Sequence, residues 1–339
     1  MFAVNFVTSV AGEHKVRHYE YTLAGEGASL YIAFMKAKNP LRFIAAASIL
    51  FLSFACVSKK TVNKTVLSAD GSSIVYKTRG KGKTALVFVH CWGCNQKFWK
   101  YQVEPFAKDF RVVTLDMAGH GQSKDFKRGQ WNVATMAQDV EAVLRELDLK
   151  EAVLVGSSMG GPISLQVAAD MPDRVRGVAC VDTLHDAEKP MPREIFQQMV
   201  LKLKADFEKG VEAFIPFMFT DHSDPRLKEW IVSEVKTCDP KACVPLLEGL
   251  AQVDLKELMR KVQVPIRCVN SAPYRPDGFK TNREVNRKYA DFDAVEMEGV
   301  GHFPMLERPD EFNGKLRQAV DSILAIPPRH SATGGNPPN

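Results

Sequence analysis

Between residues 61 and 326, segments typical of buried β-strands alternate with segments typical of amphipathic helices. The strand-like runs are apolar and rich in β-branched residues, and they cover residues 85–90, 111–116, 151–156, 175–182, 265–270 and 293–299. A hairpin with Asp70 and Gly71 at its turn precedes the first run. This alternation predicts an α/β domain, in which a mainly parallel sheet carries helices on both faces.

One long segment, residues 184–260, interrupts this alternation. It contains four successive helix-like stretches and no strand-like run. An insertion of this kind predicts a helical cap over the carboxyl edge of the sheet, where ligands bind in open α/β sheets. The alternative is a structural excursion with no role in binding. The core is then built in two parts, residues 61–183 and 261–326, and the Pro/Gly-rich tail 327–339 is predicted to be disordered.

Residues 35–60 have the layout of a secretory signal peptide, with a basic front, an uncharged apolar run at 43–57 and small residues before Cys56. The apolar run is short for a membrane span, which needs about 20 residues; the alternative is a single anchoring helix. Residues 1–34 fit no signal layout and are predicted to be an upstream extension before the true start. Two processing routes stay open: lipidation of Cys56, which would attach the chain to a membrane, or ordinary cleavage after Ala55. Both predict an exported protein, periplasmic or anchored in the cell envelope.

The charge distribution argues against a nucleic-acid partner. The net charge is +5 and is concentrated in the first 60 residues, so the globular part is nearly neutral. No metal-ligand cluster, phosphate loop or dinucleotide motif is recognisable, and no cofactor is expected. Cys91 and Cys94 have a redox or metal spacing but no second ligand pair accompanies them, and export would permit a disulfide between Cys238 and Cys243.

The pattern Gly-x-Ser-x-Gly fits this chain around Ser158 in one way only, with Gly156 and Gly160 as its glycines. The neighbouring Ser157 would need glycines at other positions. A strand-like run precedes the motif and a helix-like stretch follows it, which is the context of a nucleophile elbow. The helix start would also place N–H groups and the helix dipole near a developing anion. We therefore predict that Ser158 is a nucleophile.

A serine nucleophile needs a positioned base, and His302 is the best-placed histidine. It lies in a Gly-rich turn after the last strand-like run and before the terminal helix. Other histidines are less favourably placed, at the end of a strand, in a turn, or in or near the insertion: His90, His120, His185 and His222.

Four segments resemble the α/β-hydrolase superfamily in order and spacing: "HCWG" at 90–93, "DMAGHGQS" at 116–123, "GSSMGG" at 156–161 and "VGHFPMLERP" at 300–309. The first lies in "VFVHCWGCNQKFW", which is similar to small-molecule esterases and to the sigma-factor-regulator and hormone-receptor hydrolases. This chain has Cys91 where those usually have glycine. The resemblance implies an α/β-hydrolase fold and an oxyanion hole built from the backbone N–H groups of Trp92 and Met159.

Two carboxylates are candidates for orienting the histidine. The family usually places this acid just after the penultimate strand, where this chain has Ala272 and Pro273. Two substitutes are available: Asp182, at the end of the preceding strand, and Asp277, farther along the loop. A strand end is held rigidly, which favours Asp182.

A serine in the elbow fits hydrolysis of a small-molecule carboxylic ester or lactone through an acyl-enzyme. It argues against epoxide hydrolase and haloalkane dehalogenase chemistry, which use an aspartate there. Two alternatives remain: a ligand-sensing protein of this fold that turns over slowly and acts through a protein partner, and a non-catalytic surface protein that kept the fold.

Overall fold

The computed structural model describes residues 62–272 and 280–328. The predicted upstream extension, the signal segment with Cys56, the alternative acid Asp277 and nearly all of the predicted tail lie outside the described residues. Among the helices of the described part, none is both long enough and apolar enough to span a bilayer.

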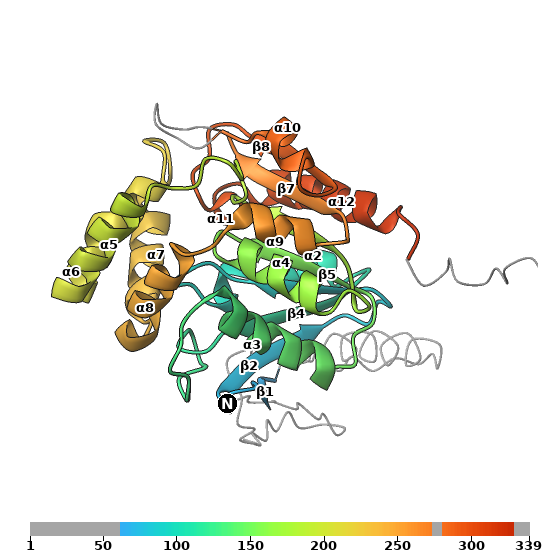
Figure 1. Ribbon diagram of the computed structural model, residues 1–339, viewed down its shortest axis with the longest axis horizontal. Coiled ribbons are helices and arrows are strands. Elements are labelled where there is room, and N and C mark those ends of the chain that lie inside the picture. The colour runs from blue at the N-terminus through green and yellow to red at the C-terminus, as the bar shows by residue number, and fades with distance from the viewer. Residues whose placement is uncertain (1–61, 273–279, 329–339) are drawn as a thin grey trace, which may run out of the picture. The chain divides into compact units, whose positions relative to one another are not determined.

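The centre of the fold is an eight-stranded sheet with the order β1-β2-β4-β3-β5-β6-β7-β8 (Figure 1). Strands β3 to β8 run parallel to one another, and β2 is antiparallel to both of its neighbours. The predicted mainly parallel sheet is therefore confirmed. The strands are β1 (Lys64–Leu67), β2 (Ser73–Arg79), β3 (Ala85–Val89), β4 (Arg111–Asp116), β5 (Ala152–Ser157), β6 (Val175–Val181), β7 (Ile266–Ser271) and β8 (Phe292–Met297).

The central strands are buried on both sides. All residues of β3 and β5 are buried, although successive side chains of a strand point to opposite faces. Helices α4 and α12 both pack against β6, and α3 and α9 pack beside α4. The helices of the described residues are α2 (Val103–Phe106), α3 (Val133–Glu146), α4 (Gly160–Asp170), α5 (Arg193–Ala205), α6 (Phe207–Phe214), α7 (Pro225–Lys236), α8 (Pro240–Leu250), α9 (Leu255–Lys261), α10 (Arg283–Arg287), α11 (Pro304–Glu307) and α12 (Pro309–Leu324), with short 3-10 turns η1 (Gln96–Trp99) and η2 (Ile215–Met218).

Local sequence signals explain several element boundaries. The predicted hairpin is β1–β2, and its turn is closed by the backbone N–H of Ser72, which donates to the Asp70 carboxylate at 2.8 Å. Helix α3 begins after Asn132, whose side chain and that of Thr135 form a capping box. This capping box satisfies N–H groups that the start of a helix leaves without partners.

Helices α5 to α9 fill the interval between β6 and β7, where the sequence predicts an insertion of helices. The stretch from residue 192 to 210 reads as one helical segment but forms two helices, because Asp206 ends α5 and its side chain caps α6. Helices α5 to α8 lie together beyond one end of the sheet (Figure 1). Helix α9 packs against α4, so the last part of the segment belongs with the core helices.

Candidate active site

Ser158 follows β5 directly and has a left-handed backbone conformation, with φ of 51°. A non-glycine residue rarely adopts this conformation, and such strain gathers at functional sites. The flanking glycines are required by close approaches. A Cβ atom on Gly156 would lie 2.2 Å from the carbonyl oxygen of Gly160, and one on Gly160 would lie 2.4 Å from that of Val89. The motif therefore encodes a sharp strand-to-helix turn into α4.

The two adjacent serines differ in exposure. Ser157, the last residue of β5, is fully buried, and its hydroxyl has no hydrogen-bond partner among the described residues. Ser158 is only partly buried. Of the two hydroxyls, that of Ser158 is the one that a substrate can reach.

His302 and Asp182 are brought together from the ends of two different strands. Nδ1 of His302 lies 2.6 Å from Oδ2 of Asp182, and the residues are 120 positions apart in the sequence. The His302 side chain is 16% exposed and that of Asp182 is 5% exposed. The short distance fixes which imidazole nitrogen faces the carboxylate and leaves Nε2 for other partners.

The second oxygen of Asp182 is also held. Oδ1 accepts a hydrogen bond from the backbone N–H of Ser271 at 2.8 Å, at the end of β7. Burial opposes ionisation of Asp182, but the hydrogen bond and charge of His302, with the Ser271 N–H, outweigh it and lower the pKa of the carboxyl below its ordinary value. Asp182 is therefore an anion at neutral pH.

Two further residues at the end of β7 support this pair, and neither stands out in the sequence. The Ser271 hydroxyl donates to the Gly301 carbonyl, next to His302. The side chain of the fully buried Asn270 accepts from the N–H of Thr183 at 3.2 Å and donates to its carbonyl at 3.1 Å. They lie close to the position at which the family usually has its acid, which is the only signal that could have indicated them.

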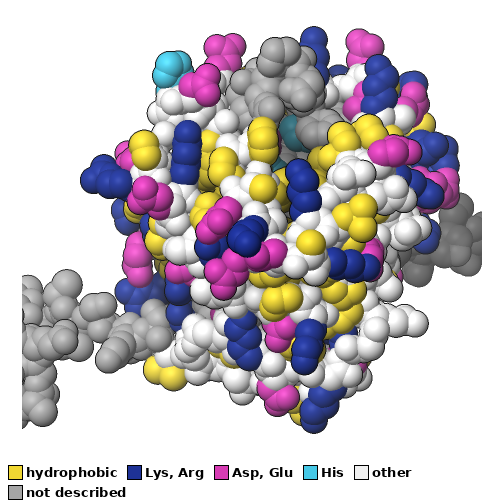
Figure 2. Space-filling view, turned by 90° about the vertical axis from the view of Figure 1, so that its left-hand side faces the viewer, with side chains coloured by type: hydrophobic (Ala, Val, Ile, Leu, Met, Phe, Trp, Pro, Cys, Tyr) yellow, Lys and Arg dark blue, Asp and Glu magenta, His cyan; other side chains and the backbone are white. Residues whose placement is uncertain are grey.

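The His302 loop also contacts the inserted helices. The backbone N–H of His302 donates to the carbonyl of Met218 in η2 at 2.7 Å. The ring of Phe219 packs against that of Phe303, with the ring centroids 5.4 Å apart. Figure 2, which faces the inserted helices, shows hydrophobic side chains around a recess in which a histidine is visible. The edge formed by described residues is apolar, as a site for an organic ligand requires.

Trp92 and Met159, the expected oxyanion donors, lie on neighbouring segments. Trp92 follows β3, and Met159 is the N-cap residue of α4. The start of α4 touches the end of β3, because a Cβ on Gly160 would lie 3.0 Å from the His90 carbonyl. Within residues 62–272 and 280–328, the backbone N–H groups of Trp92 and Met159 make no intramolecular hydrogen bond, so they are available to a ligand.

Two of the remaining histidines are structural. His90 and His120 are fully buried, and burial lowers the pKa of His90 to about 4 and that of His120 to about 3. Nε2 of His90 accepts from the N–H of Met117 at 3.0 Å, so its proton lies on Nδ1. His185 lies beside the pair described above, with Nε2 3.7 Å from Oδ1 of Asp182.

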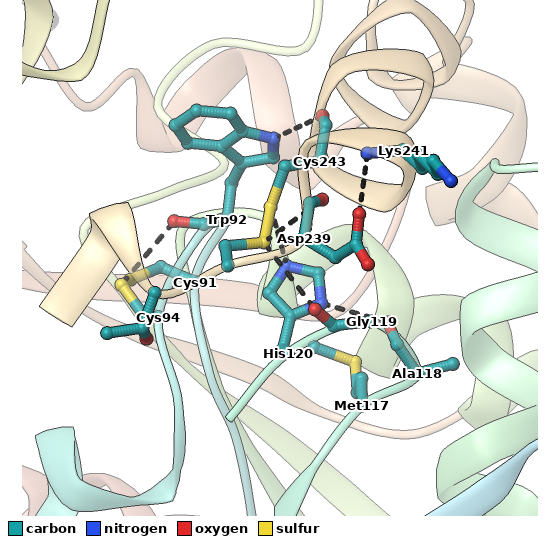
Figure 3. The surroundings of a disulfide bond; sticks show 12 residues. Cys91, Trp92, Cys94, Met117, Ala118, Gly119, His120, Asp239, Lys241 and Cys243 are labelled. Atoms are coloured by element: carbon teal, nitrogen blue, oxygen red, sulfur yellow. Dashed lines mark hydrogen bonds between the residues drawn. A yellow bond between two sulfur atoms is a disulfide. The ribbon is translucent and has the colours of Figure 1, made fainter. Parts of the chain in front are cut away.

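Four cysteines form two disulfides, Cys91–Cys94 and Cys238–Cys243. The second confirms that this pair can be bridged as the sequence allowed. Nε2 of His120 lies 3.5 Å from Sγ of Cys243, and His120, Cys238 and Cys243 form a buried group of the kind that can bind a metal ion. In this structure the two sulfurs are bonded to each other (Figure 3).

Comparison with known proteins gives consistent results. Residues 84–228 match the family model described as the alpha/beta hydrolase fold. A pimeloyl-[acyl-carrier protein] methyl ester esterase of Proteus mirabilis is 24% identical over 75% of this chain and 99% of its own length.

Solved structures agree on the fold. An esterase from Exiguobacterium antarcticum has a TM-score of 0.68 at 22% identity, covering 77% of this chain and all of its own. An N-acyl homoserine lactone degrading enzyme has a TM-score of 0.62 at 26% identity, covering 75% of this chain and 99% of its own. The sheet order, the strained turn at Ser158 and these matches show that the chain has the α/β-hydrolase fold.

Proposed function

We propose that this protein is a serine hydrolase that cleaves a carboxylic ester or a lactone. The observation that carries the proposal is the 2.6 Å contact between His302 and Asp182, in a fold whose strained elbow presents Ser158. An ionised carboxylate on Nδ1 keeps the imidazole in one tautomer and leaves Nε2 free to accept a proton. His185 faces the same carboxylate at 3.7 Å, so His302 has the shorter contact of the two.

In the proposed reaction, Nε2 of His302 takes the proton of Ser158 as Oγ attacks the ester carbonyl carbon. The carbonyl electron pair moves onto oxygen, and the N–H groups of Trp92 and Met159 stabilise that oxyanion. Collapse of the intermediate expels the alcohol, which receives its proton from His302, and leaves an acyl group on Ser158. A water molecule then attacks the acyl carbon while His302 takes its proton. Collapse of this second intermediate releases the acid, and His302 returns the proton to Oγ of Ser158.

The substrate class follows from the site and from the relatives. The proposed nucleophile and base require an acyl group, and the site contains no aspartate in the elbow. The curated relative acts on a methyl ester and a structural neighbour degrades a lactone. A carboxylic ester and a lactone each contain an acyl C–O bond that attack by a serine can break, so one mechanism serves both.

A fluorophosphonate probe tests the proposal, because it phosphonylates a serine activated by a base. We expect stoichiometric labelling of Ser158, located by peptide mass spectrometry, and hydrolysis of p-nitrophenyl esters of graded acyl length. Ser158→Ala should abolish both, with a loss of about 10⁶ in kcat. Ser157→Ala is the matched control and should keep most of the turnover. Labelling at Ser157 would overturn the assignment, and labelling with a single turnover would favour the ligand-sensing alternative.

We also propose that the protein is exported. The signal layout of residues 35–60 supports this proposal, as do the two disulfides, since disulfides persist in oxidising compartments and are rare in the cytosol. Lipidation of Cys56 and cleavage after Ala55 are the two routes by which the mature chain would arise.

A further inference from the structure

The turn that carries Trp92 is closed by a covalent bond. The Cys91–Cys94 disulfide encloses Trp92 and Gly93, with the two Cα atoms 5.3 Å apart. The backbone N–H of Cys94 donates to the Cys91 carbonyl at 3.1 Å across the same turn. Both cysteines are buried. The turn that carries Trp92 is therefore restrained by a covalent bond and by a backbone hydrogen bond.

The side chain of Trp92 is anchored on the inserted helices. Its indole Nε1–H donates to the Cys243 carbonyl at 2.7 Å, across 151 positions of sequence (Figure 3). Cys243 lies in the first turn of α8 and is bonded to Cys238, which lies just before that helix. The ring of Phe214 contacts the indole edge to face, with centroids 6.2 Å apart. A second disulfide therefore restrains Cys243, whose carbonyl accepts the hydrogen bond from the indole N–H.

The start of α8 is in turn held against the core. The N–H of Asp239 donates to the Gly119 carbonyl at 3.2 Å, and a Cβ on Gly119 would lie 2.2 Å from the Cβ of Ala242. Nδ1 of His120 lies 3.0 Å from the Ala118 carbonyl and donates to it, which leaves Nε2 facing the Cys243 sulfur. The Cys243 carbonyl, which accepts the hydrogen bond from the indole N–H, is thus held in place relative to the core.

We propose that the disulfides Cys91–Cys94 and Cys238–Cys243 are a positioning device for the oxyanion hole. The first restrains the backbone on either side of the Trp92 N–H. The second holds the carbonyl that binds the Trp92 indole, so that Trp92 is restrained at its backbone and at its side chain. This inference rests on the proposed function, because it assigns a role to the predicted donor of that same site.

The physical reason is the geometric sensitivity of charge stabilisation. An oxyanion donor acts only when it points to the position where charge develops, and losing one costs about 10²–10³ in rate. A displacement of about 1 Å can cost about 100-fold. A backbone donor cannot be removed by changing its own side chain, so its aim depends on the bonds that restrain its turn.

The test compares three double variants of the oxidised protein with the wild type. In Cys91→Ala/Cys94→Ala we expect kcat to fall about 10- to 100-fold with KM changed less than about 3-fold, because the donor acts in the transition state. Cys238→Ala/Cys243→Ala should change kcat in the same direction. Cys180→Ala/Cys268→Ala is the matched control, since it removes two buried sulfurs from β6 and β7, and it should keep its kcat.

Further measurements distinguish a misplaced oxyanion donor from a loss of folded protein. Active-site titration with the fluorophosphonate counts folded sites, and kcat is expressed per titrated site. A trifluoromethyl ketone, which forms a tetrahedral oxyanion on the serine, should lose affinity in proportion to kcat. Trp92→Phe keeps the backbone donor and loses only the bond to Cys243, so it should give a smaller loss of kcat and remain testable if a disulfide variant does not fold.

Each other result contradicts the proposal. Disulfide variants with the kcat of the control, or with losses confined to the number of titrated sites, would show that the bonds serve stability alone. Alkylation of these four cysteines before any reduction, detected by intact mass, would show that the two disulfides do not form. One zinc ion per chain by elemental analysis, with Cys238 and Cys243 unbridged, would instead assign them with His120 to a metal site. A wild type that the probe does not label would overturn the proposed function itself, which distinguishes that failure from a failure of the positioning role given to the disulfides.

Discussion

Asp182 and His302 meet at the carboxyl edge of the sheet, with Oδ2 and Nδ1 2.6 Å apart, although a second aspartate is available in the sequence near the family's usual position. The carboxylate comes from the end of β6, and its other oxygen is bound by the end of β7. Asp182 is therefore coupled to the end of β7 through Ser271.

Replacing Asp182 by Asn should lower kcat by about 10⁴ at neutral pH with the fold intact. An amide can donate to the ring and stabilise the wrong tautomer, which is the cause of an effect of that size in a serine protease. Asp277→Asn serves as the comparison and should cost little. Steady-state kinetics measures kcat of both variants, with circular dichroism as the folding control. A large loss of kcat in Asp277→Asn, with kcat retained in Asp182→Asn, would identify the loop residue as the acid.

Gly160→Ala should reduce kcat by at least about 10-fold, because its Cβ would lie 2.4 Å from the Val89 carbonyl and the elbow must shift. Gly314 in α12 is the matched control, since nothing lies within 4 Å of a Cβ at that position. Gly314→Ala should keep kcat and stabilise the helix by about 0.5–1 kcal/mol. An unchanged kcat in Gly160→Ala would contradict the role given to this close approach.

The unfolding free energy should fall as the pH is lowered from 7 to 5. His120 has a folded-state pKa of about 3, while the unfolded chain titrates near its ordinary value, so the unfolded state binds more protons in this interval. The imidazole then contributes stability that is present at pH 7 and declines by about 2 kcal/mol at pH 5. Urea titrations at both pH values on the wild type and on His120→Asn measure this. An identical pH dependence in the two proteins would rule out His120 as a source.

Export predicts a mature chain that begins at Cys56. Intact-mass measurement on protein from the native cell decides this, and a diacyl or triacyl addition to Cys56 would indicate membrane anchoring, since stable attachment takes more than one chain. An unmodified Cys56 at the new N-terminus would indicate ordinary cleavage. A chain that still carries residues 35–55 would contradict export by either route.

Local patterns determined the fold class and the elbow. The alternation of segments predicts a parallel sheet because apolar strands must be covered on both faces, and the sheet has that form. The turn around Ser158 can be predicted from sequence because close approaches require glycine at two positions, and both lie within a motif of five residues. Sequence spacing was less informative for the inserted helices, where Asp206 divides one predicted helix into two.

Tertiary structure decided which distant groups meet. The sequence left Asp182 and Asp277 both open, because a side chain's reach depends on how far each strand extends at the sheet edge. The pairing of β6 with β7 places the Asp182 carboxylate beside the Ser271 N–H. The same carboxylate contacts His302 across 120 positions of sequence, which no local pattern encodes. The bond from the Trp92 indole to Cys243 spans 151 residues and exists only because the inserted helices pack against the turn after β3.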